Sequence, residues 1–386
     1  MIRYWPYGFY EYGDQQFVLK EAALAAALHK HDPDPKIKFN FNHDVFGRID
    51  WQTEPTSSIN DLYKDRAQQL RDQYSYLILM YSGGSDSRQV LHSFLDNGIF
   101  LDEVVTIHPQ RLMSSTPVVA DPEHSHAFLF EFDLTTVPGL KDISARSPKT
   151  KITVVDSSDD IQNLYGNESY WADRQPSSRL GSGYWTVSTN AGQQHARRAS
   201  DKHSSAAVIY GCDKPNVCLR QGHLYFFFVD TGFAGSQSQR HTNPVNFDAV
   251  SFFSAADAPL IPVKQSHMIR RALSQVPALY RAFSMDGRTS WNPRLREITK
   301  HIVYPSWDTK IFQANKLSHF TFEDCRDFLQ RVDPRIYQAQ ISRKKHFNGQ
   351  YNLISTISNK HIFMIHSPSP EYFVGTVQEP LPKGAH

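Results

Sequence analysis

Four short apolar runs constrain the fold of this 386-residue chain more than any other feature of its sequence. Each run is nearly continuous in apolar residues rather than alternating, which is typical of a strand that is covered on both faces. Segments with helical spacing lie between runs. This alternation predicts βαβ units and an α/β fold with a doubly wound parallel sheet. The runs are YLILMY (76–81), EVVTIH (103–108), KITVVD (151–156) and AAVIYG (206–211).

The clearest helices flank the first run. Ser58 and Asp61 form an S-x-x-D capping box, and apolar residues then recur at helical spacing up to the strand. A second apolar stripe at residues 90–95 follows the glycine-containing segment after the first run and stops before an Asn-Gly pair. The longer connections at 109–150 and 157–205 have weaker helical patterns. We therefore expect the first strand to be packed between two well-defined helices.

Other regions of the chain do not continue this alternation of apolar runs and helical segments. KIKFNFN (36–42) is typical of a strand in a small N-terminal appendage at 1–57, and VCLRQGHLYFFFVD (217–230) predicts a hairpin. We expect a central α/β unit at 58–230 and a mixed, mainly helical region at 231–386.

Composition excludes several classes of function. The formal net charge is +2, so the chain as a whole has no strong attraction to nucleic acid or to a membrane surface. No stretch reaches the roughly 18 apolar residues of a membrane span, and the N-terminus has no signal-peptide core. Cys212, Cys218 and Cys325 fit neither a disulfide framework nor a common zinc spacing. We expect a cytoplasmic protein that makes no membrane contact.

The strongest candidate site is SGGSDS (82–87), which lies between the first apolar run and the following helix. Backbone N–H groups at the start of a helix attract anions, and glycines let the backbone approach phosphate oxygens. Asp86 fits such a site if a divalent metal accompanies the phosphates, or if its side chain caps the loop's own amides. The sequence is neither a Walker A motif nor GxGxxG. The loop therefore predicts a phosphate site of another type.

SGGSDS resembles the S-G-G-x-D-S loop of the N-type ATP pyrophosphatases, the PP-loop family of asparagine, GMP, NAD, argininosuccinate and tRNA lysidine synthetases. The helix at 58–73 leading into the strand is especially similar to the synthetase domain of glutamine-dependent asparagine synthetases. The resemblance implies an adenine nucleotide alpha hydrolase-like fold for 58–230. Those enzymes begin with a catalytic cysteine where this chain has Ile2, so it implies no attached glutaminase domain of that type.

This resemblance implies a ligase that uses ATP and Mg²⁺. Such enzymes transfer AMP to a carboxyl or carbonyl oxygen and release pyrophosphate, after which ammonia or an amine displaces AMP. Asp86 would lie near the Mg²⁺, and Thr106 and Ile107, at the end of the next strand, would lie against adenine. The phosphate ligands would be Ser82, Gly83, Gly84, Ser85 and Ser87.

A departing pyrophosphate also needs a cation to neutralise its charge. Asp213 and Lys214 follow the fourth apolar run at the edge where parallel sheets bind ligands, and Arg88 lies one residue past the loop. The pattern G-x-D-K-P around Lys214, and the later K-Q-x-H containing Lys264 and His267, resemble uncharacterised phage-encoded proteins with the same loop. Lys264 and His267 are therefore candidate substrate residues, although a solvated charged helix explains them equally well.

Three alternatives remain open. The first is a nucleotide-binding reductase or transferase resembling phosphoadenylylsulfate reductases, although the C-terminal cysteine motif of those enzymes is absent. The second is a PP-loop enzyme that modifies a nucleic-acid base, because residues 264–300 hold eight Lys or Arg residues against two carboxylates. The third is a protein that binds nucleotide without turnover. In the favoured hypothesis the acceptor is a small-molecule acid and the donor an amine.

Overall fold

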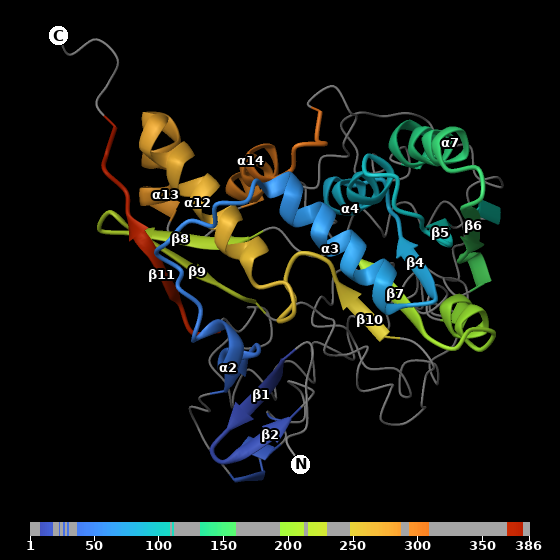
Figure 1. Cartoon of the computed structure of the whole chain (residues 1–386). Coiled ribbons are helices and arrows are strands. Elements are labelled where there is room, and N and C mark those ends of the chain that lie inside the picture. Colours follow the sequence, from blue (N-terminus) through green and yellow to red (C-terminus); the bar gives the residue numbers. More distant parts are fainter. Residues whose placement is uncertain are drawn as a thin grey trace, which may run out of the picture.

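A parallel five-stranded sheet forms the centre of the computed structural model, in the order β10-β7-β4-β5-β6 (Figure 1). The structure describes residues 8–17, 23, 26–27, 29–30, 37–108, 110–111, 132–159, 194–211, 215–229, 248–286, 293–308 and 369–380. The strands are β4 (Tyr76–Met80), β5 (Glu103–His108), β6 (Lys151–Asp156), β7 (Ala206–Tyr210) and β10 (Asp248–Ser251). The α/β class predicted from the four apolar runs is therefore confirmed.

The fifth strand was not predicted from the sequence. β10 contains four residues, DAVS, and is too short to give a recognisable apolar run. It pairs in parallel with β7, with Ala249 opposite Val208. Because β10 lies beyond residue 230, where the sequence analysis placed the end of the central unit, the sheet continues into the C-terminal region.

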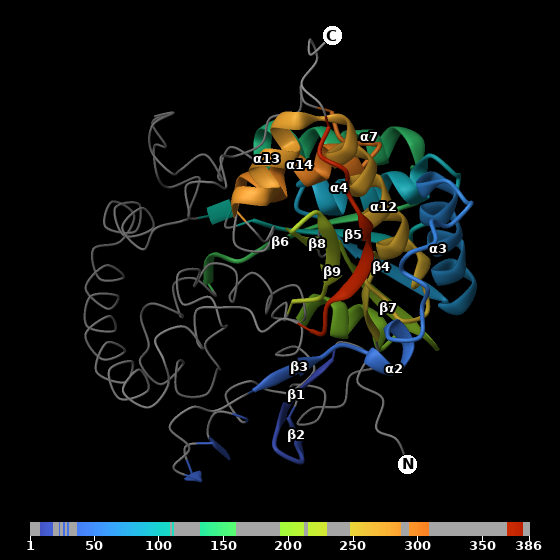
Figure 2. The ribbon, with the colours of Figure 1, turned by 90° about the vertical axis from the view of Figure 1, so that its left-hand side faces the viewer.

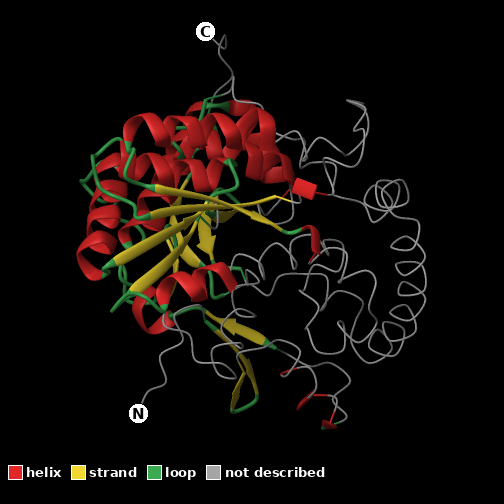
Figure 3. Ribbon diagram, turned by 90° about the vertical axis from the view of Figure 1, so that its right-hand side faces the viewer, coloured by secondary structure: helices red, strands yellow, loops and turns green. Residues whose placement is uncertain are grey.

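Helices cover both faces of this sheet (Figure 3). One face packs through Leu77, Leu79 and Val104 into the main core with α3, α4 and α7, and the other packs through Ile78 and Val105 against the helix at 194–200. Covered faces explain why these strands are apolar throughout. The helices are α2 (His43–Phe46), α3 (Ile59–Gln73), α4 (Ser85–Leu95), α7 (Val137–Arg146), α12 (Leu260–Gln275), α13 (Pro277–Asp286) and α14 (Pro293–Val303), with a π-helical turn η1 (Phe132–Thr136) before α7.

The predicted capping box is present at the start of α3. The amide of Asp61 donates to Ser58 Oγ at 3.1 Å, and the amide of Ser58 donates to Asp61 Oδ2 at 3.2 Å. These reciprocal bonds satisfy two amides that have no partner within the helix. They fix the start of the helix that leads into β4.

Two small antiparallel sheets lie beside the central one, in the orders β2-β1-β3 and β11-β9-β8 (Figure 2). The predicted hairpin is present and turns at Gln221 and Gly222. Their φ angles of 50° and 75° are typical of the two-residue turns that connect the strands of a hairpin. The strands are β1 (Phe9–Tyr12), β2 (Gln15–Phe17), β3 (Lys38–Asn40), β8 (Asn216–Arg220), β9 (His223–Phe227) and β11 (Tyr372–Thr376).

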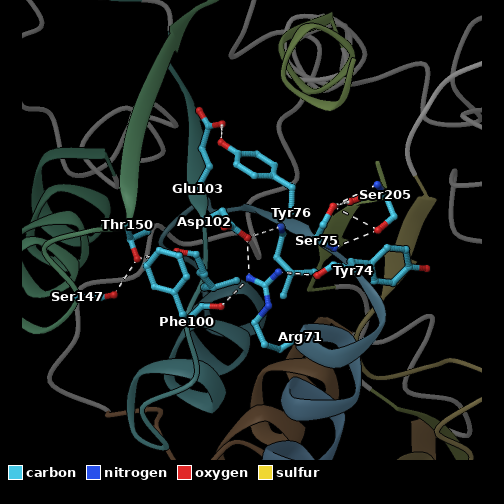
Figure 4. A network of polar contacts seen from close by, with 12 residues as sticks. Arg71, Tyr74, Ser75, Tyr76, Phe100, Asp102, Glu103, Ser147, Thr150 and Ser205 are labelled. Carbon is cyan, nitrogen blue, oxygen red and sulfur yellow. Dashed lines mark hydrogen bonds and ion pairs between the residues drawn. The ribbon is translucent and has the colours of Figure 1, made fainter. Parts of the chain in front are cut away.

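A polar network holds the amino ends of the central strands in register (Figure 4). Oδ2 of Asp102 accepts from the guanidinium of Arg71, at the end of α3, at 2.6 Å and from the amide of Leu77 at 2.7 Å. Ser75 and Ser205 bond to each other at the starts of β4 and β7. This edge of the sheet is closed by its own side chains, and open α/β sheets bind ligands at the opposite, carboxyl edge. Within the described ranges, no helix is long and apolar enough to cross a membrane.

Candidate functional site at the carboxyl edge of the sheet

The SGGSDS segment forms the turn between β4 and α4, as the sequence predicted. β4 ends at Met80, and α4 begins at Ser85 with Gly84 as its N-cap residue. Gly83 has a φ of 77°, a left-handed conformation that favours glycine. Because glycine has no side chain to serve as a cap, no side-chain hydrogen bond closes the start of α4. Since α4 begins just after the carboxyl end of β4, the positive end of its helix dipole lies at the carboxyl edge of the sheet.

Hydrogen bonds within the turn involve two of its serines. The amide of Ser82 donates to Ser87 Oγ at 3.2 Å, and that hydroxyl donates to the carbonyl of Gly84, also at 3.2 Å. The amide of Gly84 has a weaker contact with Ser82 Oγ at 3.4 Å. The Ser87 hydroxyl, which the resemblance assigns to phosphate, thus supports the shape of the turn in this structure.

Ser82 and Ser85 differ sharply in exposure. Ser82 is exposed, whereas Ser85 retains 2% of its accessible surface and its hydroxyl has no hydrogen-bond partner among the residues that the structure describes. A buried hydroxyl without a partner is costly and calls for an explanation. A ligand oxygen beside the turn is one explanation that the predicted phosphate site supplies.

Two neighbouring segments press against the turn. Thr136 Oγ1, at the junction of η1 and α7, donates to the carbonyl of Ser82 at 2.9 Å. Gly211, directly after β7, lies so close that a Cβ there would be 2.8 Å from the amide nitrogen of Ser87. Backbone from three parts of the chain therefore meets here, and it does so only because Gly83 and Gly211 lack side chains.

Asp86 extends from the first turn of α4 towards the C-terminal helices. Its Oδ1 accepts a hydrogen bond of 2.6 Å from the hydroxyl of Tyr304, which follows α14 and is 1% exposed. A bond this short between a phenol and a carboxylate is typical of a charge-assisted interaction. Asp86 is thus held in place by a residue more than two hundred positions away.

The end of β5 lies beside the turn. The β4–β5 ladder ends at Val105, so Thr106 and Ile107 lie past it towards the carboxyl edge, and Thr106 is 2% exposed. The next residue, His108, stacks on Phe132 with ring centroids 3.8 Å apart. Burial lowers the pKa of His108 below its usual value although the carboxylates of Asp133 and Asp156 act in the opposite direction. The positions predicted to face adenine are therefore near the turn.

Asp156 ends β6 at the same edge. Burial alone would raise the pKa of this carboxyl, but hydrogen bonds from Ser158 and Arg111 hold it below its usual range. Ser158 donates to Oδ1 through its amide at 2.9 Å, and Arg111 pairs with Oδ2 at 2.8 Å. Among the described residues, no group of three or more His, Cys, Asp or Glu side chains has the arrangement of a metal site. Asp156 is therefore accounted for by its own neighbours.

Arg88 is the described cation nearest in sequence to the turn. Its Nε is buried and has no hydrogen-bond partner within the part of the chain that the structure describes. Burial lowers the pKa of His92, one turn further along α4, and the nearby Arg88 charge contributes.

Asp213 and Lys214, the other predicted catalytic residues, lie outside the described residues, between Gly211 and Pro215.

Lys264 and His267, the predicted substrate residues, lie on α12 and contact the segment at 51–55. Lys264 pairs with Glu54 at 2.8 Å and donates to the carbonyl of Pro55 at 2.9 Å. His267 is 4% exposed, and its Nε2 lies 3.0 Å from the carbonyl of Trp51. Burial lowers the pKa of His267, which favours the neutral ring. These contacts join α12 to the chain before α3 and require no ligand.

Thr136 and Tyr304 were not identified from the sequence. Thr136 lies in a connection with weak helical signals, and Tyr304 follows a short helix in a region without a recognisable motif. Neither position carries a local pattern, because each acquires its contact only when distant segments pack together.

Comparisons of the chain with protein-family models, with curated proteins and with solved structures returned no match.

Proposed function

We propose that this protein is an ATP-dependent ligase of the PP-loop type, with an adenine nucleotide alpha hydrolase-like central domain. In this proposal it transfers AMP from ATP to a carboxyl or carbonyl oxygen, releases pyrophosphate and joins ammonia or an amine to the activated acceptor. The observation that carries the proposal is the turn at 82–87. It places SGGSDS between a buried parallel strand and the uncapped start of α4, at the carboxyl edge of the sheet.

The residues of the turn fit the polyphosphate of ATP. Gly83 and Gly84 present backbone without side chains, and the exposed Ser82 supplies a hydroxyl. The buried hydroxyl of Ser85 has no partner within the described part of the chain. Helix N-termini and successive backbone amides are common binding sites for phosphate. In this proposal Thr106 and Ile107 flank the adenine, since they end the strand next to the turn.

Asp86 is the residue that fits Mg²⁺. Magnesium in nucleotide sites is usually held by one or two carboxylates together with substrate phosphates, so a single aspartate beside the turn is sufficient. The metal would supply positive charge against the phosphate oxygens. Asp86 would hold it, and Arg88 would add a cation on the same helical turn.

The reaction requires stabilisation of the charge that grows on pyrophosphate as it departs. Backbone donors fixed before the reaction are effective because they need no reorganisation. The turn is fixed by the Thr136 bond to Ser82 and by the close packing of Gly211. Each donor of this kind is worth about 3 kcal/mol, or roughly a hundredfold in rate.

The test is a product assay. The protein is incubated with ATP, Mg²⁺ and pooled small carboxylic acids and amines, and AMP and pyrophosphate are measured. We expect both products, and we expect Asp86→Asn to lower their rate of formation roughly a hundredfold. Asp65→Asn is the matched control, because Asp65 is exposed on α3. ATP binding without products would contradict the ligase assignment, and absence of ATP binding would contradict the whole proposal.

A further inference from the structure

The hydrogen bond between Tyr304 and Asp86 joins the C-terminal helices to the candidate nucleotide site. Tyr304 is 1% exposed, and its hydroxyl donates to Asp86 Oδ1 at 2.6 Å. Phenolic hydroxyls that are buried usually have a polar partner, and a carboxylate is the strongest acceptor available to them. The contact crosses 218 positions of sequence, so it exists only in the folded protein.

Tyr304 is held rigidly by its own neighbours. Its amide donates to the carbonyl of Lys300 at 2.9 Å, and its ring lies 5.1 Å from that of Phe253. The carbonyl of the preceding residue, Val303, accepts a bond of 2.9 Å from the hydroxyl of Tyr63 on α3. The Tyr63 hydroxyl in turn accepts a bond of 2.8 Å from Gln265 on α12. Side chains from α3 and α12 therefore fix the backbone from which Tyr304 extends.

The same segment contacts α4 at a second point. The amide and the hydroxyl of Ser306 both donate to Oε1 of Gln89, at 3.1 and 2.8 Å. Gln89 lies three residues after Asp86 and is 4% exposed. Residues 304–306, which we call the clasp, thus contact the first two turns of α4 through the side chains of Tyr304 and Ser306. One contact involves the candidate metal ligand, and the other does not.

We propose that Tyr304 is a positioning residue for the Mg²⁺–nucleotide site, an inference that rests on the proposed function. An aspartate in the first turn of a helix has competing conformations, because its side chain can fold back onto the amides of its own turn. The bond from Tyr304 holds the carboxylate in one orientation before nucleotide and metal arrive. Fixing a side chain before binding removes an ordering cost that would otherwise weaken affinity.

The test compares Tyr304→Phe with Ser306→Ala. Tyr304→Phe removes the bond to Asp86, and Ser306→Ala weakens the other contact of the clasp without changing Asp86. Equilibrium binding of ATP is measured by calorimetry at several Mg²⁺ concentrations and with EDTA, alongside the midpoint of thermal unfolding. We expect Tyr304→Phe to raise the Kd for ATP with Mg²⁺ roughly fivefold to tenfold and the Kd with EDTA less than twofold. We expect Ser306→Ala to leave the Mg²⁺ dependence as in the unchanged protein.

Two outcomes would overturn the inference while leaving the proposed function intact. One is an unchanged Mg²⁺ dependence in Tyr304→Phe, and the other is an equal change in Ser306→Ala, which would mean that the clasp is merely structural. A double-mutant cycle adds a second measurement: in an Asp86→Asn background, Tyr304→Phe is expected to have no further effect on Kd. Failure of the unchanged protein to bind ATP would instead reject the proposed function, and this inference with it.

Discussion

Gly83→Ala is expected to destabilise the protein by about 3 kcal/mol and to abolish the proposed nucleotide binding. Gly83 has a φ of 77°, where an L-residue costs about 1–2 kcal/mol. A Cβ there would lie 2.6 Å from Thr136 Oγ1 and 2.9 Å from the Cα and the amide nitrogen of Thr136. The hydroxyl can rotate away, but the backbone of Thr136 cannot without moving the start of α7. The turn would therefore shift away from the position that presents its amides.

Gly98→Ala is the matched control for this experiment. Gly98 has a φ of 65°, and a Cβ there would meet nothing within 4 Å. This variant carries the cost of the left-handed conformation alone, about 1 kcal/mol. Urea unfolding measures both free energies, and ATP binding is measured on the folded variants. Equal losses for the two variants would show that contact with Thr136 does not constrain the turn.

The sequence indicated most of the central sheet because burial on both faces is a local property of a strand. Continuous apolar runs found β4, β5, β6 and β7, and the capping box found the start of α3. β10 was missed because only four of its residues pair with β7, which is too few to leave a recognisable apolar run in the sequence. β11 was missed for a related reason, since its role depends on pairing with β9 across a long stretch of chain.

The candidate site divides in the same way. The turn at 82–87 was found from six consecutive residues, because its glycines and serines are required by local geometry. Thr136, Gly211 and Tyr304 complete it through packing between distant segments. Gly211 begins the G-x-D-K-P pattern, but that pattern does not indicate a contact with the turn, and no pattern surrounds Thr136 or Tyr304. The K-Q-x-H pattern suggested a substrate contact for Lys264, which stays a prediction, and the sequence did not indicate that Lys264 pairs with Glu54 in the folded chain.

The other large effect is expected at Glu103, which begins β5 on the opposite edge of the sheet. Its side chain is fully buried and lies 2.8 Å from the Tyr76 hydroxyl, 2.7 Å from Nε2 of His195 and 2.9 Å from Nζ of Lys151. Thr153 donates a further hydrogen bond. These contacts join three strands and the helix at 194–200, which covers the second face of the sheet.

Burial alone would raise the pKa of Glu103, but the hydrogen bonds from Thr153, Lys151, Tyr76 and His195 lower it from the ordinary 4.5 to about 2. The ionised form of the Glu103 carboxyl is therefore more stable in the folded protein than in the unfolded chain. A depressed pKa contributes stability that is complete above pH 4.5 and is lost as the pH falls towards 2. Converted at about 1.4 kcal/mol per pH unit, the contribution is about 3 kcal/mol.

Glu103→Gln is accordingly expected to lower the free energy of unfolding by about 3 kcal/mol at pH 7, because the amide keeps the shape of the side chain and loses its charge. The difference from the unchanged protein should shrink as the pH falls below 4.5, since protonated Glu103 then resembles the amide. Urea unfolding between pH 7 and pH 3.5 measures this difference. Asp142→Asn is the control, because Asp142 is 39% exposed and its pair with Arg146 is worth at most about 0.5 kcal/mol. A pH-independent difference would mean that the loss at Glu103 comes from packing, and that the carboxylate charge does not hold the amino edge of the sheet together.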